Sequence, residues 1–234
     1  GKTSNLTKSP PPWLKNGIEN MKNNYLPGIL AMAIIVVASN VLVQYLFGDW
    51  LTWGAFTYPL AFLVTDVMNR VYGIAAARRV VFVGFCVGIL CSLIGTQVML
   101  QGDGYSYPAV TLRVALGSGI GFLIAQMLDV QIFDRLRSGP WWRAPLASTV
   151  IGSAVDTALF FTIAFSVMFN SLEVASVPDW AQGGVPLLGS GPELPLWVSL
   201  AIADWLVKLS IALTALVPFR MLVKYLVGRS VKNH

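Results

Sequence analysis

Long apolar stretches separated by short polar segments run along most of the chain. Six of them, over residues 26–47, 50–69, 80–100, 109–128, 145–169 and 196–219, approach or exceed the length that a membrane-spanning helix needs. That length is roughly 20 residues, because a helix rises about 1.5 Å per residue and the hydrocarbon core is about 30 Å thick. The pattern predicts an all-α fold, a polytopic membrane protein with six transmembrane helices.

The polar segments are too short to form further domains. Residues 1–25 are predicted to be a cytoplasmic tail, residues 26–225 a six-helix transmembrane domain, and residues 226–234 a second cytoplasmic tail. The first span is too long for a cleaved signal peptide. The connection between the fifth and sixth spans is rich in Gly and Pro, and two roles stay open for it: covering an outer entrance, or simply linking the spans.

Lys and Arg residues gather in alternate connections, and only Arg113 and Lys208 lie inside spans. The others are Lys2, Lys8, Lys15 and Lys22, then Arg70, Arg78 and Arg79, then Arg135, Arg137 and Arg143, then Arg220, Lys224, Arg229 and Lys232. Cytoplasmic loops of membrane proteins carry such an excess of cations, so both termini are predicted to be cytoplasmic. The net charge of +5 is therefore a signal of topology, and no nucleic-acid partner is expected.

Cysteine and histidine usage removes several kinds of catalysis. Cys86 and Cys91 share one span at a spacing that suits neither a redox pair nor a metal site. The only histidine is the terminal His234, which removes a Ser/His hydrolase, a histidine metal site and a histidine proton relay. Neither Asp66 nor Asp156 has the Gly-x-Gly-Asp or Tyr-Asp context of an aspartyl intramembrane protease. We therefore expect no enzyme, no cofactor and no metal.

Three ionisable residues, Asp156, Asp204 and Lys208, lie in the middle of predicted spans. Each ionised group at the centre of a membrane helix costs roughly 2.5 to 3.5 kcal/mol, so such residues are candidates for function. Counted from the predicted cytoplasmic ends, Asp156 and Lys208 each lie about 16 Å deep and can meet at the midplane. Asp204 precedes Lys208 by one helical turn and can also pair with it. Whether Lys208 pairs with one or both carboxylates stays open at this point.

Other polar residues in the spans are weaker candidates. Asn40 and Gln44, Asp66 and Asn69, and Gln126 and Asp129 form pairs one turn apart, each able to face a shared interior or to bond between helices. Asp66 and Asp129 lie nearer the inner rim, and Arg113 is expected to be structural, with a side chain that can extend outward to the interface. Trp205 is either a packing residue or a stacking surface for a planar ligand. Pro59 is expected to break the second span.

Four blocks of residues resemble a known family. The first is Tyr58-Pro59-Leu60-Ala61-Phe62-Leu63-Val64-Thr65-Asp66 with Asn69, Tyr72-Gly73 and Ala77-Arg78-Arg79. The others are Gln126-Met127-Leu128-Asp129-Val130 with Phe133, Gly152-Ser153-Ala154-Val155-Asp156-Thr157 with Phe160 and Phe165, and Asp204 with Lys208 and Pro218. In combination, over about residues 28–225, they resemble the VUT family of queuosine precursor transporters. The resemblance implies import of the 7-deazaguanines preQ0 and preQ1 across a bacterial inner membrane.

The resemblance also implies a substrate-binding site for a guanine-like base. A carboxylate, Asp156 or Asp66, would accept the two adjacent N–H groups of the base. Lys208 would donate to the opposite side, within a cluster that includes Asp204. Amides would complete the edges, and rings would stack on the faces. The amide candidates are Asn40, Gln44 and Gln126, and the ring candidates are Phe62, Phe160 and Trp205.

Several alternatives stay open. Proton symport and simple facilitated diffusion are both compatible with these residues. A chain of this size also resembles the substrate-binding subunit of an energy-coupling-factor transporter, which needs partner ATPases, since the sequence has no Walker A motif. An assembly subunit without a ligand is a third alternative. The lipid bilayer and a small molecule are the expected partners, and a homodimer is a further prediction.

Overall fold

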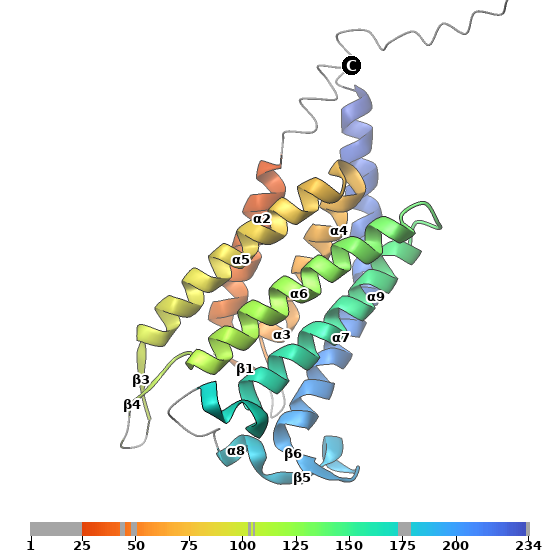
Figure 1. The fold of residues 1–234 in the computed structure, drawn as a ribbon. Coiled ribbons are helices and arrows are strands. Elements are labelled where there is room, and N and C mark those ends of the chain that lie inside the picture. The colour runs from red at the N-terminus through yellow and green to blue at the C-terminus, as the bar shows by residue number, and fades with distance from the viewer. Residues whose placement is uncertain are drawn as a thin grey trace, which may run out of the picture.

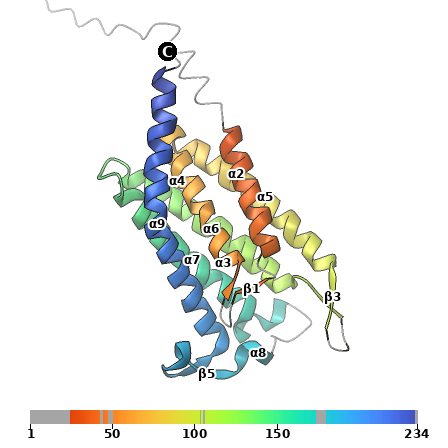
Figure 2. The ribbon, with the colours of Figure 1, turned by 180° about the vertical axis from the view of Figure 1, so that it is seen from behind.

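The computed structural model describes residues 25–42, 45–47, 51–102, 104, 106–172 and 179–232. Its long helices lie side by side in an elongated bundle, from which the last helix extends at one end (Figures 1 and 2). They are α2 (Leu26–Leu42), α4 (Leu60–Tyr72), α5 (Ile74–Gln97), α6 (Leu112–Leu136), α7 (Arg143–Phe165) and α9 (Leu196–Lys232). The prediction of an all-α fold is confirmed.

Short elements occupy the connections at the other end of the bundle (Figure 1). Three two-stranded antiparallel hairpins pair β1 (Leu46–Phe47) with β2 (Leu51–Thr52), β3 (Met99–Gln101) with β4 (Ser106–Pro108), and β5 (Gly184–Pro186) with β6 (Glu193–Pro195). The helical pieces are α3 (Gly54–Thr57), α8 (Asp179–Gln182) and the 3-10 turns η1 (Val167–Leu172) and η2 (Leu187–Gly189). The connection between the fifth and sixth predicted spans thus contains regular structure.

Four helices, α5, α6, α7 and α9, are long and apolar enough to cross a membrane, and α2 is a shorter apolar helix. Many large apolar side chains on these helices are exposed, as lipid-facing residues are; Ile94 of α5, for example, is 65% exposed. The chain is therefore an all-α multi-pass membrane protein. The second predicted span is broken as expected: α3 ends at Thr57 and α4 begins at Leu60, with Pro59 between them.

Helix ends differ from the predicted spans mainly on the cationic side. The helix α5 begins at Ile74 rather than at residue 80, α6 ends at Leu136 rather than at 128, and α9 continues to Lys232 rather than ending at 219. The apolar stretches stop where charged residues begin. The helices continue beyond that point, because charged residues at a membrane surface remain good helix formers.

The two ends of the bundle differ in charge. The start of α2, the α4–α5 turn, the α6–α7 turn and the end of α9 lie at the same end (Figures 1 and 2). The cations of that end include Arg70, Arg79, Arg137 and Arg220. The hairpins lie at the opposite end, whose described loops contain no Lys or Arg. The alternation read from the sequence therefore corresponds to two spatially separate ends.

The helices α6 and α7 approach each other closely because glycines line their contact. A Cβ atom added at Gly117 would lie 3.1 Å from the carbonyl oxygen of Phe160, and one at Gly121 would lie 3.2 Å from a carboxylate oxygen of Asp156. Small residues at helix contacts let the two backbones come together in this way. The glycines thus hold α6 against the face of α7 that carries Asp156.

Arg113 joins the same two helices at the end where the hairpins lie. Its Nε and Nη2 both donate to the carbonyl oxygen of Ile163, Nη2 also donates to that of Ser166 at 2.6 Å, and Nη1 donates to Asn170 Oδ1. The side chain is 1% exposed. The possibility that Arg113 extends outward to the interface is therefore wrong. The carbonyl oxygens at the end of α7 accept hydrogen bonds from its guanidinium group inside the bundle, which is a structural role.

Replacing Arg113 by Ala or by Lys is expected to destabilise the protein. Either change leaves carbonyl oxygens at the end of α7 without a donor, and lysine cannot reproduce the planar donor fork. We expect a loss of at least about 2 kcal/mol, since each hydrogen bond to a charged group contributes about 1.5 to 3 kcal/mol. Melting in detergent measures it, with Arg78→Ala at an exposed position of α5 as the control. Equal melting temperatures for Arg113→Lys and the parent would contradict the role of the fork.

Candidate functional site

The central polar cluster joins α7 to α9. The Nζ of Lys208 donates to Asp156 Oδ2 at 2.8 Å, and it also forms an ion pair with Asp204 on its own helix. Lys208 therefore pairs with both carboxylates, which answers the question that the sequence left open. Helical geometry explains the arrangement: residues 204 and 208 share one face of α9, and Asp156 lies at a matching depth on α7.

Two hydroxyl groups complete this cluster. Tyr58 Oη donates to Asp156 Oδ1 at 3.0 Å, and its ring lies 5.3 Å from Lys208 Nζ. Thr157 Oγ1 donates to Asp204 Oδ2 at 2.9 Å and accepts from Lys208 Nζ at 3.0 Å. We call Tyr58, Asp156, Thr157, Asp204 and Lys208 the central cluster.

Tyr58 and Thr157 were not among the predicted site residues. Tyr58 stands immediately before Pro59, at the break between α3 and α4, and the break directs its side chain to α7. Both residues lie in the motif blocks quoted above, beside a proline and an aspartate respectively. A search for hydroxyl groups next to intramembrane charges would have found Thr157. Tyr58 could not be found in this way, because its contact with Asp156 depends on the direction that the chain takes at the break between α3 and α4.

The central cluster is buried and carries unequal numbers of charges. Asp156 and Lys208 are each 4% exposed, and Thr157 is 5% exposed. Two carboxylates face one ammonium group, so the ionised cluster has one negative charge in excess. Charges buried this deeply interact more strongly than exposed ones, since little water screens them. The cluster therefore favours a ligand that brings hydrogen-bond donors or positive charge.

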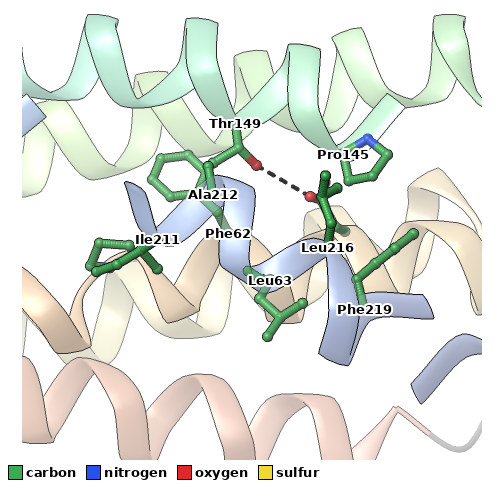
Figure 3. Close-up of a pocket in the computed structure, with 11 residues that line it drawn as sticks. Phe62, Leu63, Pro145, Thr149, Ile211, Ala212, Leu216 and Phe219 are labelled. Atoms are coloured by element: carbon green, nitrogen blue, oxygen red, sulfur yellow. Dashed lines mark hydrogen bonds between the residues drawn. The ribbon is translucent and has the colours of Figure 1, made fainter. Parts of the chain in front are cut away.

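Asp66 lies apart from the central cluster, in a second polar group between α4, α6 and α7. Its carboxylate accepts from Ser148 Oγ and Thr149 Oγ1, each at 3.3 Å, and it faces Asp129. Asp66 and Thr149 also line a narrow cavity that α9 closes with Ile211, Ala212 and Leu216 (Figure 3). We call Asp66 and Asp129 the inner carboxylate pair; Ser148 and Thr149 are the hydroxyl residues beside it.

The predicted amides occupy three different places. Gln126 accepts from Thr65 Oγ1 at 2.7 Å, and its buried Nε2 has no partner among the described residues. Asn40 donates to the carbonyl oxygen of Val36 and lines a second cavity together with Tyr58. Gln44 lies outside the described residues. Only Asn40 shares a cavity with a member of the central cluster.

The predicted ring residues are also distributed. Phe62 is 1% exposed and lines the cavity beside Asp66. Phe160 packs edge to face against Phe161, with ring centroids 5.1 Å apart. Trp205 follows Asp204 on α9, and its buried Nε1 has no partner among the described residues.

The two cavities are small in this conformation. The volume open to the centre of a water molecule is about 10 Å³ in the cavity beside Asp66 and about 20 Å³ in the cavity beside Tyr58. A single water needs about 10 to 15 Å³ on this measure, so each cavity has room for about one water. In this conformation the members of the central cluster bond to one another.

Sequence comparison identifies the family of the chain. The profile of the family described as putative vitamin uptake transporter matches residues 52–223, which include every member of the central cluster and of the inner carboxylate pair. The chain belongs to this family. Its members are transporters, which are not a class of enzyme. No solved structure matches the chain significantly.

Curated relatives match over most of their length. A queuosine precursor transporter of Escherichia coli is 31% identical over 86% of this chain and 88% of its own. Probable queuosine precursor transporters of Haemophilus influenzae and Bacillus subtilis are 30% and 28% identical, over 79% and 73% of this chain and 79% and 71% of their own. The resemblance noted in the sequence is confirmed, and no name among these relatives points to an energy-coupling-factor subunit.

Proposed function

We propose that this chain is a transporter that imports queuosine precursors, the 7-deazaguanines preQ0 and preQ1, across a bacterial inner membrane. The observation that carries this proposal is the central cluster: a buried Asp156–Lys208 pair, with Tyr58 and Asp204, inside a chain of the vitamin uptake transporter family. Intramembrane charges are costly and are kept where a substrate or ion passes.

We infer six spans with both termini on the cytoplasmic side. Besides the four long helices, α2 and the pair α3–α4 would each cross, since 17 residues extend about 26 Å and residues 54–72 about 28 Å. The break at Pro59 lies inside the bundle, where Tyr58 donates a hydrogen bond to Asp156 of α7. The end that carries Arg70, Arg79 and Arg137 would face the cytoplasm.

The base would bind at Asp156. Its two carboxylate oxygens already accept from Tyr58 Oη and Lys208 Nζ, two donors that stand where the N1–H and 2-amino groups of a guanine-like base would stand. Binding exchanges these internal donors for those of the base. A carboxylate that accepts two parallel N–H bonds rejects bases that lack either donor, because one oxygen then stays buried without a partner.

Lys208 would keep a carboxylate partner during that exchange. When the base takes over Asp156, Lys208 retains Asp204 and Thr157 as partners, and it can donate to the O6 or N7 side of the base. Asn40 lines the cavity beside Tyr58 and would contact an edge of the base as the cavity widens. A homodimer stays a prediction, which the mass of the purified protein in detergent would check.

A ligand panel tests the proposed function. PreQ0 and preQ1 are expected to raise the melting temperature of the purified chain, since a ligand at 100 times its dissociation constant stabilises by about 2.7 kcal/mol. Guanine, queuine and unrelated vitamins serve as comparisons, and vitamins should give no shift. Uptake of radiolabelled preQ1 by liposomes that contain the chain alone separates a transporter from a binding subunit that needs ATPases. No shift with either 7-deazaguanine would contradict the proposal.

A further inference from the structure

We propose that Asp66 and Asp129 form a proton-binding site that couples transport to the proton gradient, separate from the site that binds the base. The two carboxyl groups face each other from α4 and α6, and they are 2% and 0% exposed. This inference rests on the proposed function for its coupling role. The presence of the proton itself can be measured without transport.

The hydrogen bonds around the pair are unequal. Both oxygens of Asp66 accept a hydroxyl, one from Ser148 Oγ and the other from Thr149 Oγ1. Neither oxygen of Asp129 accepts a hydrogen bond of good geometry from the described residues, although both are buried and the Ser148 hydroxyl lies close by. A buried carboxylate without donors or a cation is strongly disfavoured, so Asp129 needs a partner that the side chains of the fold do not supply.

A proton between the two groups supplies that partner. Hydrogen bonds between their neighbours hold Asp66 and Asp129 together: Thr65 Oγ1 donates to Gln126 Oε1, and Asn69 Nδ2 donates to the carbonyl oxygen of Val130. Two ionised carboxylates cannot hydrogen-bond, because both only accept; a carboxyl and a carboxylate can, because one donates. Carboxyl pairs this close therefore hold one proton between them, since both cannot ionise together.

No cation among the described residues replaces the proton. Arg70, one turn beyond Asp66, donates Nη1 to the carbonyl oxygen of Arg137 and lies over the Phe133 ring, while its buried Nη2 has no partner and makes no ion pair among the described residues. Arg137 pairs with Asp134. The helix α7 contributes the two hydroxyls, and α9 faces the adjoining cavity with the apolar side chains of Ile211, Ala212, Ala215 and Leu216. The described ion pairs of the chain include neither Asp66 nor Asp129.

The central cluster is the weaker candidate for the coupling proton. There Lys208 pairs with both Asp156 and Asp204, and every carboxylate has at least one donor. A proton added to either carboxylate would remove one of the two buried ion pairs of Lys208, whereas a proton at the inner carboxylate pair removes none. The two sites thus differ in what they lack: the central cluster has its own cation, and the inner carboxylate pair has none.

The same structural elements connect the two sites. The chain leading into α4 contacts α7 through Tyr58 and Asp156, and α4 itself contacts α7 through Asp66 and Thr149. Thr149 and Asp156 are two turns apart on α7, about 10 Å. A base that displaces Tyr58 from Asp156 therefore acts on the contact that orients Asp66. Two sites that share a movable contact can exchange free energy in this way.

The test combines infrared spectroscopy with transport by the full chain. The parent is expected to show the C=O band of a protonated carboxyl at neutral pH, and Asp129→Asn and Asp66→Asn are each expected to lose it. In liposomes, an inward proton gradient should raise preQ1 uptake several-fold in the parent and leave uptake by Asp129→Asn unchanged. Asp134→Asn, a partly exposed position on the same helix, is the matched control and should keep both properties.

The outcomes separate this inference from the proposed function. A carboxyl band that persists in both variants, or uptake that follows a sodium gradient and ignores the proton gradient, overturns the proton site. Bound preQ1 with uptake indifferent to the proton gradient overturns the coupling. If the parent binds no 7-deazaguanine, the proposed function fails, and the infrared band then decides alone whether the pair holds a proton. Retained melting temperatures in the variants show that they fold.

Discussion

Asp156→Asn is expected to lower preQ1 binding and uptake about 100-fold or more, since each hydrogen bond to a charged group contributes about 1.5 to 3 kcal/mol and two are lost or weakened. The substitution keeps the size of the side chain. It replaces one accepting oxygen with an N–H donor, which would oppose an N–H group of the base, and it removes the charge that Tyr58 and Lys208 now share. Melting shifts with preQ1 and uptake into liposomes measure the effect.

Two comparisons make the result specific to this carboxylate. Asp134→Asn removes a partly exposed carboxylate whose ion pair among the described residues is with Arg137, and it should leave binding unchanged. Asp66→Asn alters the inner carboxylate pair and should lower the affinity for preQ1 far less than Asp156→Asn does, because Asp66 acts on the base only through the coupling between the two sites. Full uptake by a correctly inserted Asp156→Asn protein would refute the role of Asp156 in binding the base.

Lys208→Met is expected to be the most destabilising single change in the chain. It leaves Asp156 and Asp204 buried with no cation between them, and removing one partner of a buried ion pair costs about 3 to 5 kcal/mol. Methionine fills nearly the same volume, so packing changes little. Thr157 Oγ1 and Tyr58 Oη remain as donors, but they cannot balance two negative charges. The melting temperature in detergent should fall sharply.

A charge-balanced double variant shows whether the effect is electrostatic. Lys208→Met with Asp204→Asn leaves one buried carboxylate instead of two, and it should recover part of the lost stability. Lys224→Met changes an exposed lysine on the same helix and should have little effect. If the double variant melts no higher than Lys208→Met alone, the loss comes from packing rather than from charge.

The matching depths of the charges in the central cluster could be predicted because they depend on regular helix geometry. A fixed rise per residue placed Asp156 and Lys208 at one depth, and the spacing of one turn placed Asp204 on the same face as Lys208. The break at Pro59 was predictable too, since proline has no N–H to donate. The ends of α5, α6 and α9 could not be predicted, because hydropathy identifies the apolar segment of a helix and not its full length.

The separation of Asp66 from Asp156 could not be predicted. Both are acidic residues in motif blocks and both were candidates for the same role, yet Asp66 lies with Asp129, Ser148 and Thr149. The rotation of each helix about its axis decides which neighbours a side chain meets, and that rotation follows from packing, such as the contact of Gly117 and Gly121 with α7. For the same reason the sequence suggested that Arg113 reaches outward, whereas it caps α7.

By itself, the sequence determined that this chain is an all-α membrane protein, in which alternate connections carry the cations and three charges lie near mid-depth. These features follow from local properties: the length of apolar segments, the positions of Lys and Arg, and the rise of a helix. Only the tertiary structure decided that Lys208 binds both carboxylates, that Tyr58 joins them, and that Asp66 and Asp129 form a second site. Those contacts join helices far apart in the chain, and side-chain packing between the helices selects them.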